Sequence, residues 1–233
     1  MKLAVISGAS AGIGLATARL FHAKGYRVLN ISRRSTTDQF ITDLHCDLAD
    51  PTAIQRIAEE LRVEYQKSAA ICLVHNACHM ASGTVIDFDN GLLRKVLEVN
   101  LIAPNALNQL TIPAMKHGSA IIYIGSTLSE KAVANSFSYV TSKHAIVGMM
   151  RATCQDLVGK GIHTACVCPG FTDTEMLRLH LDNAPDELEQ VQQMNSFKRL
   201  IKPEEIADLI VWAAENPVIN GSVLHANLGQ IER

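Results

Sequence analysis

Short apolar runs alternate with longer amphipathic stretches along the chain. The apolar runs predict strands at 2–7, 27–32, 44–46, 70–75, 119–125, 163–168 and 222–226. Between them, apolar residues recur at helical spacing near 13–24, 51–66, 89–117, 137–159 and 203–215. Continuous apolar strands separated by helices are typical of a parallel sheet that is covered on both faces. The pattern therefore predicts an α/β fold.

No linker, repeat or low-complexity stretch divides the 233 residues. We therefore expect one domain that spans residues 1–233. The stretch 173–202 is less regular than its surroundings and contains Asn183 and Pro185. It predicts an inserted helical flap that covers a substrate.

Charge and composition exclude several classes of function. The formal net charge is −2 and no block of like charges occurs, which argues against nucleic-acid binding. No apolar run is long enough for a membrane span, and the turn at 8–12 cuts the apolar start of the chain too short for a signal peptide. We expect a cytoplasmic protein with reduced thiols. The spacing of Cys72, His75, Cys78 and His79 matches no standard zinc pattern, so we expect no metal.

Tyr139, Lys143 and Ser126 form the strongest chemical signal. In a helix over 136–158, positions i and i+4 lie on one face, roughly 5–6 Å apart at Cβ. A lysine ammonium held there favours the tyrosinate, so a phenol with an ordinary pKa of about 10 could exchange protons near neutral pH. Ser126 follows the apolar run 120–125, which predicts a buried parallel strand. Its hydroxyl would lie at the carboxyl end of that strand, where α/β sheets place their chemistry.

A glycine-rich turn joins the first predicted strand to the first helix. Gly8, Gly12 and Gly14 permit positive φ and a close approach of a phosphate to the backbone. The helix would present unpaired amides and its positive dipole end to that anion. The spacing G-x-x-x-G-x-G is not the common G-x-G-x-x-G, and no P-loop lysine is present. With a second strand at the right distance, a dinucleotide site is favoured over a turn that is merely tight.

The end of the second predicted strand indicates which dinucleotide binds. NAD sites usually place Asp or Glu there, whereas arginine accommodates the 2′-phosphate of NADP. This chain has Asn30-Ile31-Ser32-Arg33-Arg34 and no acid. We expect Arg33 and Arg34 to bind the phosphate and NADP to be preferred over NAD. The alternative is a solvated basic pair on an exposed turn.

In order and spacing, these motifs resemble those of the short-chain dehydrogenase/reductase family over nearly the whole chain. The matching residues are Gly8, Gly12, Ile13, Gly14, Asp47, Leu48, Asn76, Ala77, Asn100, Ser126, Tyr139, Lys143, Pro169, Gly170, Thr174, Asn220 and Gly221. The resemblance implies a Rossmann-like doubly wound fold with a seven-stranded parallel sheet and helices on both faces. It also implies reversible hydride transfer between a nicotinamide and an alcohol or carbonyl, in a homodimer or homotetramer built on the helices near 89–117 and 137–159.

The resemblance further assigns catalytic roles to four residues. Tyr139 would be the acid in carbonyl reduction and the base in alcohol oxidation, and Ser126 would orient the substrate oxygen. Lys143 would lower the pKa of the tyrosine and hold the nicotinamide ribose. Asn100 would fix a water that connects Lys143 to solvent.

Cofactor contacts are implied in the same way. Asp47 and Leu48 would meet the adenine, and Asn76 would lie near the adenosine ribose. Thr174, with backbone from Pro169 to Thr172, would position the nicotinamide carboxamide. The remaining expected cofactor residues are Gly8, Ser10, Gly12, Ile13, Gly14, Arg33, Arg34, Ala77, Tyr139, Lys143 and Gly170.

The chain departs from the family pattern near the expected cofactor. Ser7 replaces a threonine, and His75 and Cys78 stand where the Asn-Asn-Ala-Gly motif has Asn and Gly. Cys78 would add a side chain close to the cofactor and could be sensitive to oxidation.

The predicted substrate wall is apolar, which suits apolar carbonyl compounds, although several of its members could instead face the core or a neighbouring subunit. Its members are Leu128, Val133, Phe137, Phe171, Met176, Leu177 and Leu179.

A catalytically silent NAD(P)-binding regulatory protein of the same fold is the competing functional class. The complete set of Asn100, Ser126, Tyr139 and Lys143 favours an enzyme. An enoyl reductase or a sugar-nucleotide epimerase is a lesser option, because an enoyl-type site would normally widen the Tyr-to-Lys spacing and the chain leaves little room for a substrate domain.

Overall fold

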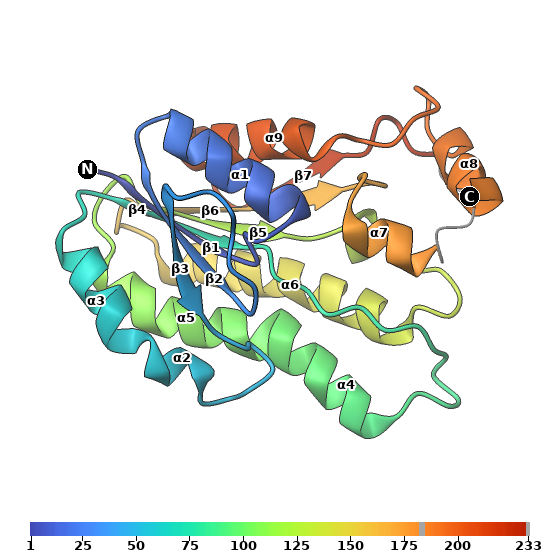
Figure 1. The fold of residues 1–233 in the computed structure, drawn as a ribbon, viewed down its shortest axis with the longest axis horizontal. Coiled ribbons are helices and arrows are strands. Elements are labelled where there is room, and N and C mark those ends of the chain that lie inside the picture. The colour runs from blue at the N-terminus through green and yellow to red at the C-terminus, as the bar shows by residue number, and fades with distance from the viewer. Residues whose placement is uncertain (182–184, 232–233) are drawn as a thin grey trace.

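A computed structural model describes residues 1–181 and 185–231, and a seven-stranded parallel sheet runs through this part of the chain (Figure 1). The strands are β1 (Leu3–Ser7), β2 (Arg27–Ser32), β3 (Ile41–His45), β4 (Ile71–His75), β5 (Ala120–Ile124), β6 (His163–Pro169) and β7 (Ser222–Ala226). Their order in the sheet is β3-β2-β1-β4-β5-β6-β7. The predicted Rossmann-like doubly wound α/β fold is confirmed.

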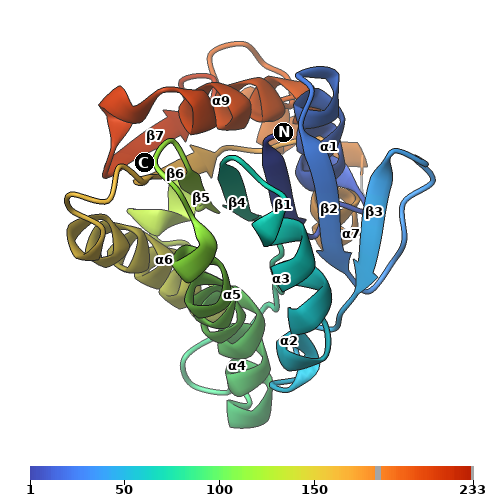
Figure 2. The same ribbon diagram turned by 90° about the vertical axis from the view of Figure 1, so that its left-hand side faces the viewer.

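Helices cover both faces of the sheet (Figure 2). One face carries α1 (Gly12–Ala23) and α9 (Pro203–Glu215), and the other carries α3 (Ala58–Gln66), α5 (Ala103–Thr111) and α6 (Phe137–Asp156). Side chains alternate between the faces along a strand, so Leu3 and Val5 join one apolar core while Ala4 and Ile6 join the other. Burial on both faces explains why the strands read as continuous apolar runs.

The helix prediction for 89–117 fails in its detail. The segment consists of α4 (Asn90–Leu97), a π-helical turn (Glu98–Ile102), α5 and a 3-10 turn (Ile112–Ala114). Side-chain hydrogen bonds from Asn100 to neighbouring segments accompany the wide π turn. Such turns are frequent at functional sites.

Two other boundaries also differ from the prediction. Strand β3 begins at Ile41 rather than at residue 44, because Thr42, which is exposed, and Asp43, which is half-buried, interrupt the apolar pattern. The helix expected over 51–66 is split into α2 (Ala53–Arg56) and α3, and Ile57 between them leaves helical geometry at φ −99° and ψ 3°.

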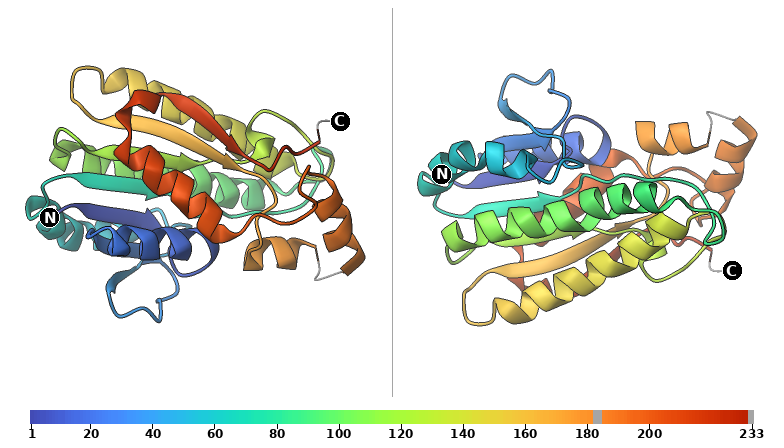
Figure 3. Two further views of the ribbon diagram at one scale, coloured as in Figure 1. Left: turned by 90° about the horizontal axis from the view of Figure 1, so that it is seen from above. Right: turned by 90° about the horizontal axis from the view of Figure 1, so that it is seen from below.

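The carboxyl ends of the strands all lie at one edge of the sheet, and α7 (Glu175–His180) and α8 (Pro185–Gln193) lie beyond that edge (Figures 1 and 3). These helices belong to the predicted flap, of which residues 182–184 fall outside the described residues. The base of the flap is closed by backbone bonds, since Ile201 donates to the Phe171 carbonyl at 2.9 Å and accepts from the Asp173 amide at 2.9 Å. Short 3-10 turns at Thr127–Ser129 and Pro217–Ile219 complete the described elements.

The turn between β1 and α1 leaves little room for a side chain at Gly8 and none at Gly14. Gly8 has φ +73°, in the left-handed region that favours glycine. A Cβ on Gly14 would lie 2.2 Å from the Gly8 carbonyl oxygen and 2.5 Å from Nδ2 of Asn76. The start of α1 is therefore packed directly against the turn and against the end of β4.

We expect Gly14→Ala to lower the free energy of unfolding by about 1–3 kcal/mol, as overpacking of a tight core does. Gly148→Ala is the matched control, because Gly148 also lies in a helix and its Cβ would meet no atom within 4 Å. Higher helix propensity should make that variant up to about 1 kcal/mol more stable. Denaturant unfolding measures both, and equal changes in the two variants would contradict the packing described here.

Candidate active site

Ser126, Tyr139 and Lys143 come together at the carboxyl edge of the sheet. Ser126 follows β5 and is 9% exposed, while Tyr139 and Lys143 lie one turn apart on α6. The Lys143 ammonium nitrogen is 5.5 Å from the centre of the Tyr139 ring. A hydrogen bond between Ser126 and the Tyr139 phenol lowers the pKa of that phenol. The three side chains therefore share one site.

Burial sets the net pKa of Tyr139. It raises the pKa of the phenol, and the Lys143 charge and the hydrogen bond with Ser126 only partly reverse this rise. The sequence led us to expect a lowered pKa. Lys143 does act in that direction, but desolvation outweighs it, so the buried phenol is a weaker acid than a free one.

Lys143 is 6% exposed, and its Nζ donates a hydrogen bond to the Ile124 carbonyl at 2.8 Å. Burial lowers the pKa of this ammonium, but the negative charges of the ionised forms of Cys78, Tyr139, Cys166 and Cys168 together raise it more, so the net pKa lies above its ordinary value. The side chain is therefore a fixed cation at neutral pH, tied to the end of β5.

The carboxamide of Asn100 clamps two neighbouring segments. Its Oδ1 accepts from the His79 amide at 2.7 Å, and its Nδ2 donates to the His79 carbonyl at 3.0 Å and to the Ser142 hydroxyl at 2.9 Å. Both amide hydrogens of Asn100 are thus used by protein groups. Asn100 lies in the π-helical turn, so this turn links the segment after β4 to α6.

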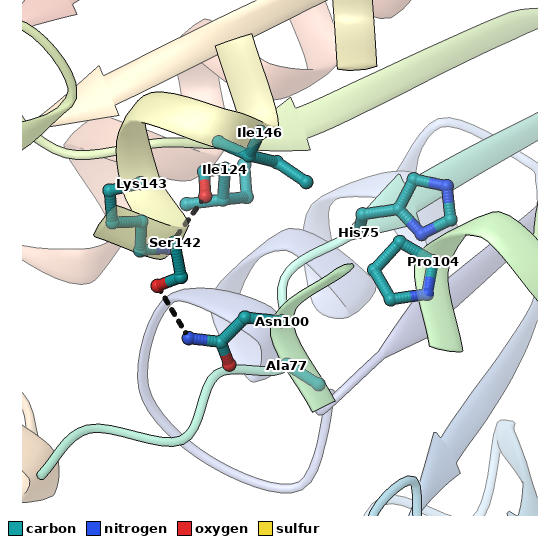
Figure 4. A pocket seen from close by; sticks show the side chains of 8 residues that line it. All are labelled: His75, Ala77, Asn100, Pro104, Ile124, Ser142, Lys143 and Ile146. Atoms are coloured by element: carbon teal, nitrogen blue, oxygen red, sulfur yellow. Dashed lines mark hydrogen bonds between the residues drawn. The ribbon is translucent and has the colours of Figure 1, made fainter. Parts of the chain in front are cut away.

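A small cavity of about 10 Å³ lies between Asn100 and Lys143 (Figure 4). Figure 4 shows Lys143, Ser142 and Ile124 on one side of it and His75 and Pro104 on the other. Ala77 and Ile146 also contribute to the lining. The volume is close to the lower limit for one water molecule.

The glycine-rich turn fits a phosphate group. No side chain caps the amino end of α1, so the first amides of the helix remain available to an anion. A Cβ on Gly12 would lie 3.1 Å from Cγ2 of Thr174, so the turn and the start of α7 face each other closely. Ser10 and Ile13 are half-buried in the same turn.

The serine that replaces threonine in this turn retains a structural hydroxyl. Oγ of Ser7 accepts from the amides of Asn76 and Ala77, both at 3.0 Å. Asn76 in turn donates through Nδ2 to the carbonyls of Ser7 and Gly8 at 3.1 and 2.9 Å. These four hydrogen bonds, and a fifth from Oγ of Ser7 to the Val74 carbonyl at 3.4 Å, join the ends of β1 and β4.

Asn30 is a buried residue whose hydrogen bonds hold two loops of the site together, and the sequence did not lead us to predict this role. Its Oδ1 accepts from the Ala9 amide at 2.8 Å, and its Nδ2 donates to Asp43 at 2.7 Å and to Ser32 at 2.9 Å. It thereby fixes the glycine-rich turn relative to the loop after β2. The sequence feature that could have indicated this role is the position of Asn30, a polar residue inside the apolar run 27–32.

The two arginines after β2 differ in their surroundings. Arg34 forms a two-pronged ion pair with Glu175, at 2.9 and 3.3 Å, which ties the loop to the start of α7. Arg33 is exposed and makes no ion pair within the described residues. The guanidinium of Arg34 is therefore already paired, whereas that of Arg33 is open to solvent, and the binding of a phosphate by either stays a prediction.

The remaining predicted residues line the same edge. Asp47 is half-buried and accepts from the Ala49 amide at 3.0 Å, and Leu48 beside it is buried. Pro169 ends β6, and the Gly170 amide donates to the Ala226 carbonyl at 2.9 Å. The Thr172 hydroxyl donates to the Gly170 carbonyl at 3.0 Å, and Thr174 caps α7 by accepting from the Leu177 amide at 3.3 Å.

None of the helices in residues 1–181 and 185–231 has the length and apolar character needed to cross a bilayer. Within the same residues, no cluster of three or more His, Cys, Asp or Glu side chains could hold a metal ion.

A doubly wound sheet that carries a glycine-rich turn and a Ser–Tyr–Lys group at its carboxyl edge defines a nucleotide-dependent oxidoreductase fold. Comparison with protein families agrees, since a family described as enoyl-(acyl carrier protein) reductase matches residues 8–230. The chain belongs to the short-chain dehydrogenase/reductase family, as its motifs suggested.

Individual relatives are named for different activities. The 3-oxoacyl-(acyl-carrier-protein) reductase FabG of Escherichia coli (strain K12) is 28% identical over 241 residues, covering 98% of this chain and 96% of that protein. A short-chain dehydrogenase family protein from Francisella tularensis superposes with a TM-score of 0.88 at 25% identity, covering 98% of both chains. Aldohexose dehydrogenase of Thermoplasma acidophilum gives 0.88 at 26% identity, covering 98% of this chain and 93% of that one.

We expect the His75 imidazole to stay neutral at pH values well below the ordinary histidine pKa. Burial lowers its pKa to about 4, and the hydrogen bond to Asn108 opposes this only in part. The Tyr123 ring lies 4.8 Å from the imidazole, tilted by 36°, and Lys143 lies across the cavity. Because the unfolded chain has an ordinary histidine pKa of about 6.5, it binds more protons between roughly pH 4 and 6.5. The free energy of unfolding should therefore fall as the pH falls through this window.

Heteronuclear NMR of ring-labelled histidine would follow this titration in the folded protein, with the urea-unfolded chain as reference. A His75 midpoint near 6.5 in the folded state would contradict the burial described here.

Proposed function

We propose that the protein catalyses NADP(H)-dependent, reversible hydride transfer between a carbonyl and an alcohol. The observation that carries the proposal is the meeting of Ser126, Tyr139 and Lys143 at the sheet edge that also bears the uncapped start of α1. A proton donor, a fixed cation and an anion site are what reduction by a nicotinamide dinucleotide requires of a protein.

The fit of a dinucleotide rests on the cradle around Gly8, Gly12 and Gly14, where side chains are excluded and helix amides are available. Bound NADPH would supply the hydride. We assign the pyrophosphate to the turn from Gly8 to Gly14, the adenine to Asp47 and Leu48, and the adenosine ribose to Asn76 and Ala77. The nicotinamide end is assigned to Tyr139, Lys143, Thr174 and the backbone from Pro169 to Thr172.

The protein's own residues would then orient and protonate the oxygen of the substrate. Ser126 orients this oxygen by a hydrogen bond, and Tyr139 gives its proton as alkoxide character develops. The raised pKa of Tyr139 keeps the phenol protonated at neutral pH, which suits the acid role. Lys143 stabilises the tyrosinate that forms, because its ammonium is held beside the ring.

For the adenosine 2′-phosphate we favour Arg33 as the principal contact. Its guanidinium is exposed. Burial lowers the pKa of His79 most, and the charges of Lys95 and Arg33 lower it further, so both cations lie near this end of the site. Arg34 would contribute after its pair with Glu175 is exchanged for the phosphate. An exposed pair of this kind is worth only about 0–1 kcal/mol, so a doubly charged phosphate can displace it.

The substrate is proposed to be an apolar carbonyl compound. The segment 127–138 and the flap offer Val133, Met176 and Leu179, which are exposed. The FabG of E. coli is named for 3-oxoacyl groups, and an acyl chain would suit such a wall.

We also propose a homodimer or homotetramer formed through α5 and α6. These helices lie side by side in Figure 3, and Ile102 and Val158 are exposed nearby.

Two other functions are less well supported. Enoyl reduction is suggested by the description of the matching family, but the four-residue spacing from Tyr139 to Lys143 favours carbonyl reduction. A silent NAD(P)-binding protein would have no need of a lysine ammonium buried beside a tyrosine.

Tyr139→Phe should lower kcat for carbonyl reduction by at least about 10²-fold, because general acid catalysis typically contributes roughly 10²–10⁴-fold. NADPH oxidation would be followed by absorbance with ketones, aldehydes, 3-oxoacyl thioesters and enoyl thioesters. Binding of NADPH, measured by fluorescence, should change little and serves as the control for folding. Undiminished turnover would eliminate Tyr139 as the proton donor.

Arg33→Asp should weaken NADPH binding much more than NADH binding, by roughly tenfold or more, since a charge-assisted phosphate contact is lost and a repulsive carboxylate is added. Lys160→Asp makes the same change of charge in the exposed turn before β6, at the opposite edge of the sheet, and should affect both cofactors alike. Equal losses for both cofactors in Arg33→Asp would remove the assignment of the 2′-phosphate.

A further inference from the structure

An aspartate of β3 holds the loop that follows β2. Asp43 is half-buried and lies directly across from Asn30 in the parallel pairing of the two strands. Oδ1 of Asp43 accepts from Nδ2 of Asn30 at 2.7 Å, and Oδ2 accepts from the Thr36 amide at 3.0 Å. Each carboxylate oxygen therefore binds a donor, one in the sheet and one in the loop. Hydrogen bonds to an ionised acceptor are roughly twice as strong as neutral ones.

The carboxylate also determines the orientation of the Asn30 side chain. Asn30 is 1% exposed, and its Oδ1 accepts from the Ala9 amide at 2.8 Å. Because a carboxylate can only accept, Nδ2 of Asn30 must face Asp43 and Oδ1 must face the glycine-rich turn. In this orientation Nδ2 also donates to the Arg34 carbonyl at 3.3 Å, which accepts from the Ser32 hydroxyl as well. The loop is thus fixed at a second point.

Arg33 lies between fixed points of the backbone. Before it, the Ser32 carbonyl accepts from the Cys46 amide at 3.0 Å and so extends the pairing of β2 with β3. After it, the Arg34 carbonyl and the Thr36 amide are bonded to side chains of the sheet. The Arg33 side chain itself is exposed. A ligand that binds this guanidinium therefore has little of the loop to order, which favours affinity.

We propose that Asp43 is a positioning residue for the 2′-phosphate of NADP. By holding the loop through Thr36 and Asn30, its carboxylate keeps Arg33 where the guanidinium can meet that phosphate. The inference rests on the proposed function, since it takes NADP as the ligand. Asp43 does not itself bind the phosphate, because its two oxygens serve protein donors.

The charge of Asp43 alone would have the opposite effect. A carboxylate near a doubly charged phosphate repels it, so removal of this charge would tighten NADPH binding if Asp43 acted only through its field. Removal of an anchor would instead let the loop adopt other conformations and would weaken NADPH binding. The direction of the change in Kd therefore separates the two roles.

The central test is Asp43→Asn, with the Kd of NADPH and of NADH measured by fluorescence titration without substrate. The variant keeps the shape of the side chain, but the NH₂ group that replaces one oxygen cannot accept a hydrogen bond. We expect NADPH to bind about tenfold more weakly, because a hydrogen bond to a charged group is lost, and NADH to change less than about twofold. Unchanged or tighter NADPH binding would overturn the proposal, and so would equal losses for both cofactors.

Asp38→Asn is the matched control. Asp38 belongs to the same loop and pairs with Arg19 of α1 at 2.6 Å, so this variant removes the same charge without breaking the bonds of Asp43. NADPH binding should change less than about twofold, because an ion pair at the surface is weak. A loss as large as that of Asp43→Asn would contradict the anchoring role.

A double-mutant cycle tests whether Asp43 acts through Arg33. In an Arg33→Ala background, Asp43→Asn should weaken NADPH binding by less than about twofold, because the group that it positions is absent. The full loss in that background would show that Asp43 acts independently of Arg33 and would reject the proposal.

The loop can also be followed in the absence of cofactor. In the wild type the Thr36 amide should exchange its hydrogen with solvent at least about tenfold more slowly than an unprotected amide, and Asp43→Asn should abolish this protection. Unprotected exchange in the wild type would refute the anchor even if the variant does not fold. Wild-type protein that binds NADPH no better than NADH would reject the cofactor assignment and this inference with it, whereas a preference that survives Asp43→Asn would reject the inference alone.

Discussion

The hydrogen bonds that join the ends of β1 and β4 are the constraint on which the site depends. Ser7 accepts two backbone amides from the segment after β4, and Asn76 donates to two carbonyls of the turn after β1. From this point β1 leads to α1 on one face of the sheet, whereas β4 leads towards α4 and α5 on the other. The chain diverges in opposite directions here, and such a divergence opens the crevice in which doubly wound folds bind their ligands. Gly14 lets α1 begin directly on this junction.

Much of this arrangement was predictable because the relevant forces are local or periodic. The strands that are buried on both faces, such as β4 and β5, read as unbroken apolar runs, and the spacing of Tyr139 and Lys143 follows from helix geometry alone. Strand β3 was predicted too short, since Thr42 and Asp43 interrupt its apolar pattern.

Contacts between distant segments could not be predicted in the same way. The ion pair of Arg34 with Glu175 joins residues 141 positions apart, and no sequence pattern near either residue predicts it. The π-helical turn around Asn100 depends on partners in the segment after β4 and in α6. The net direction of the Tyr139 pKa depends on how deeply the fold buries the phenol, which spacing does not reveal.

The ion pair between Arg34 and Glu175 has a consequence for how α7 responds to its surroundings. Both side chains are more than half exposed, at 62% and 55%, so dissolved salt screens their attraction. At most about 1 kcal/mol is available, which biases an equilibrium between docked and undocked positions by roughly fivefold. Ionic strength should therefore tune how often α7 rests against the loop after β2. The pair is a weak electrostatic bias that a bulky anionic ligand can readily override.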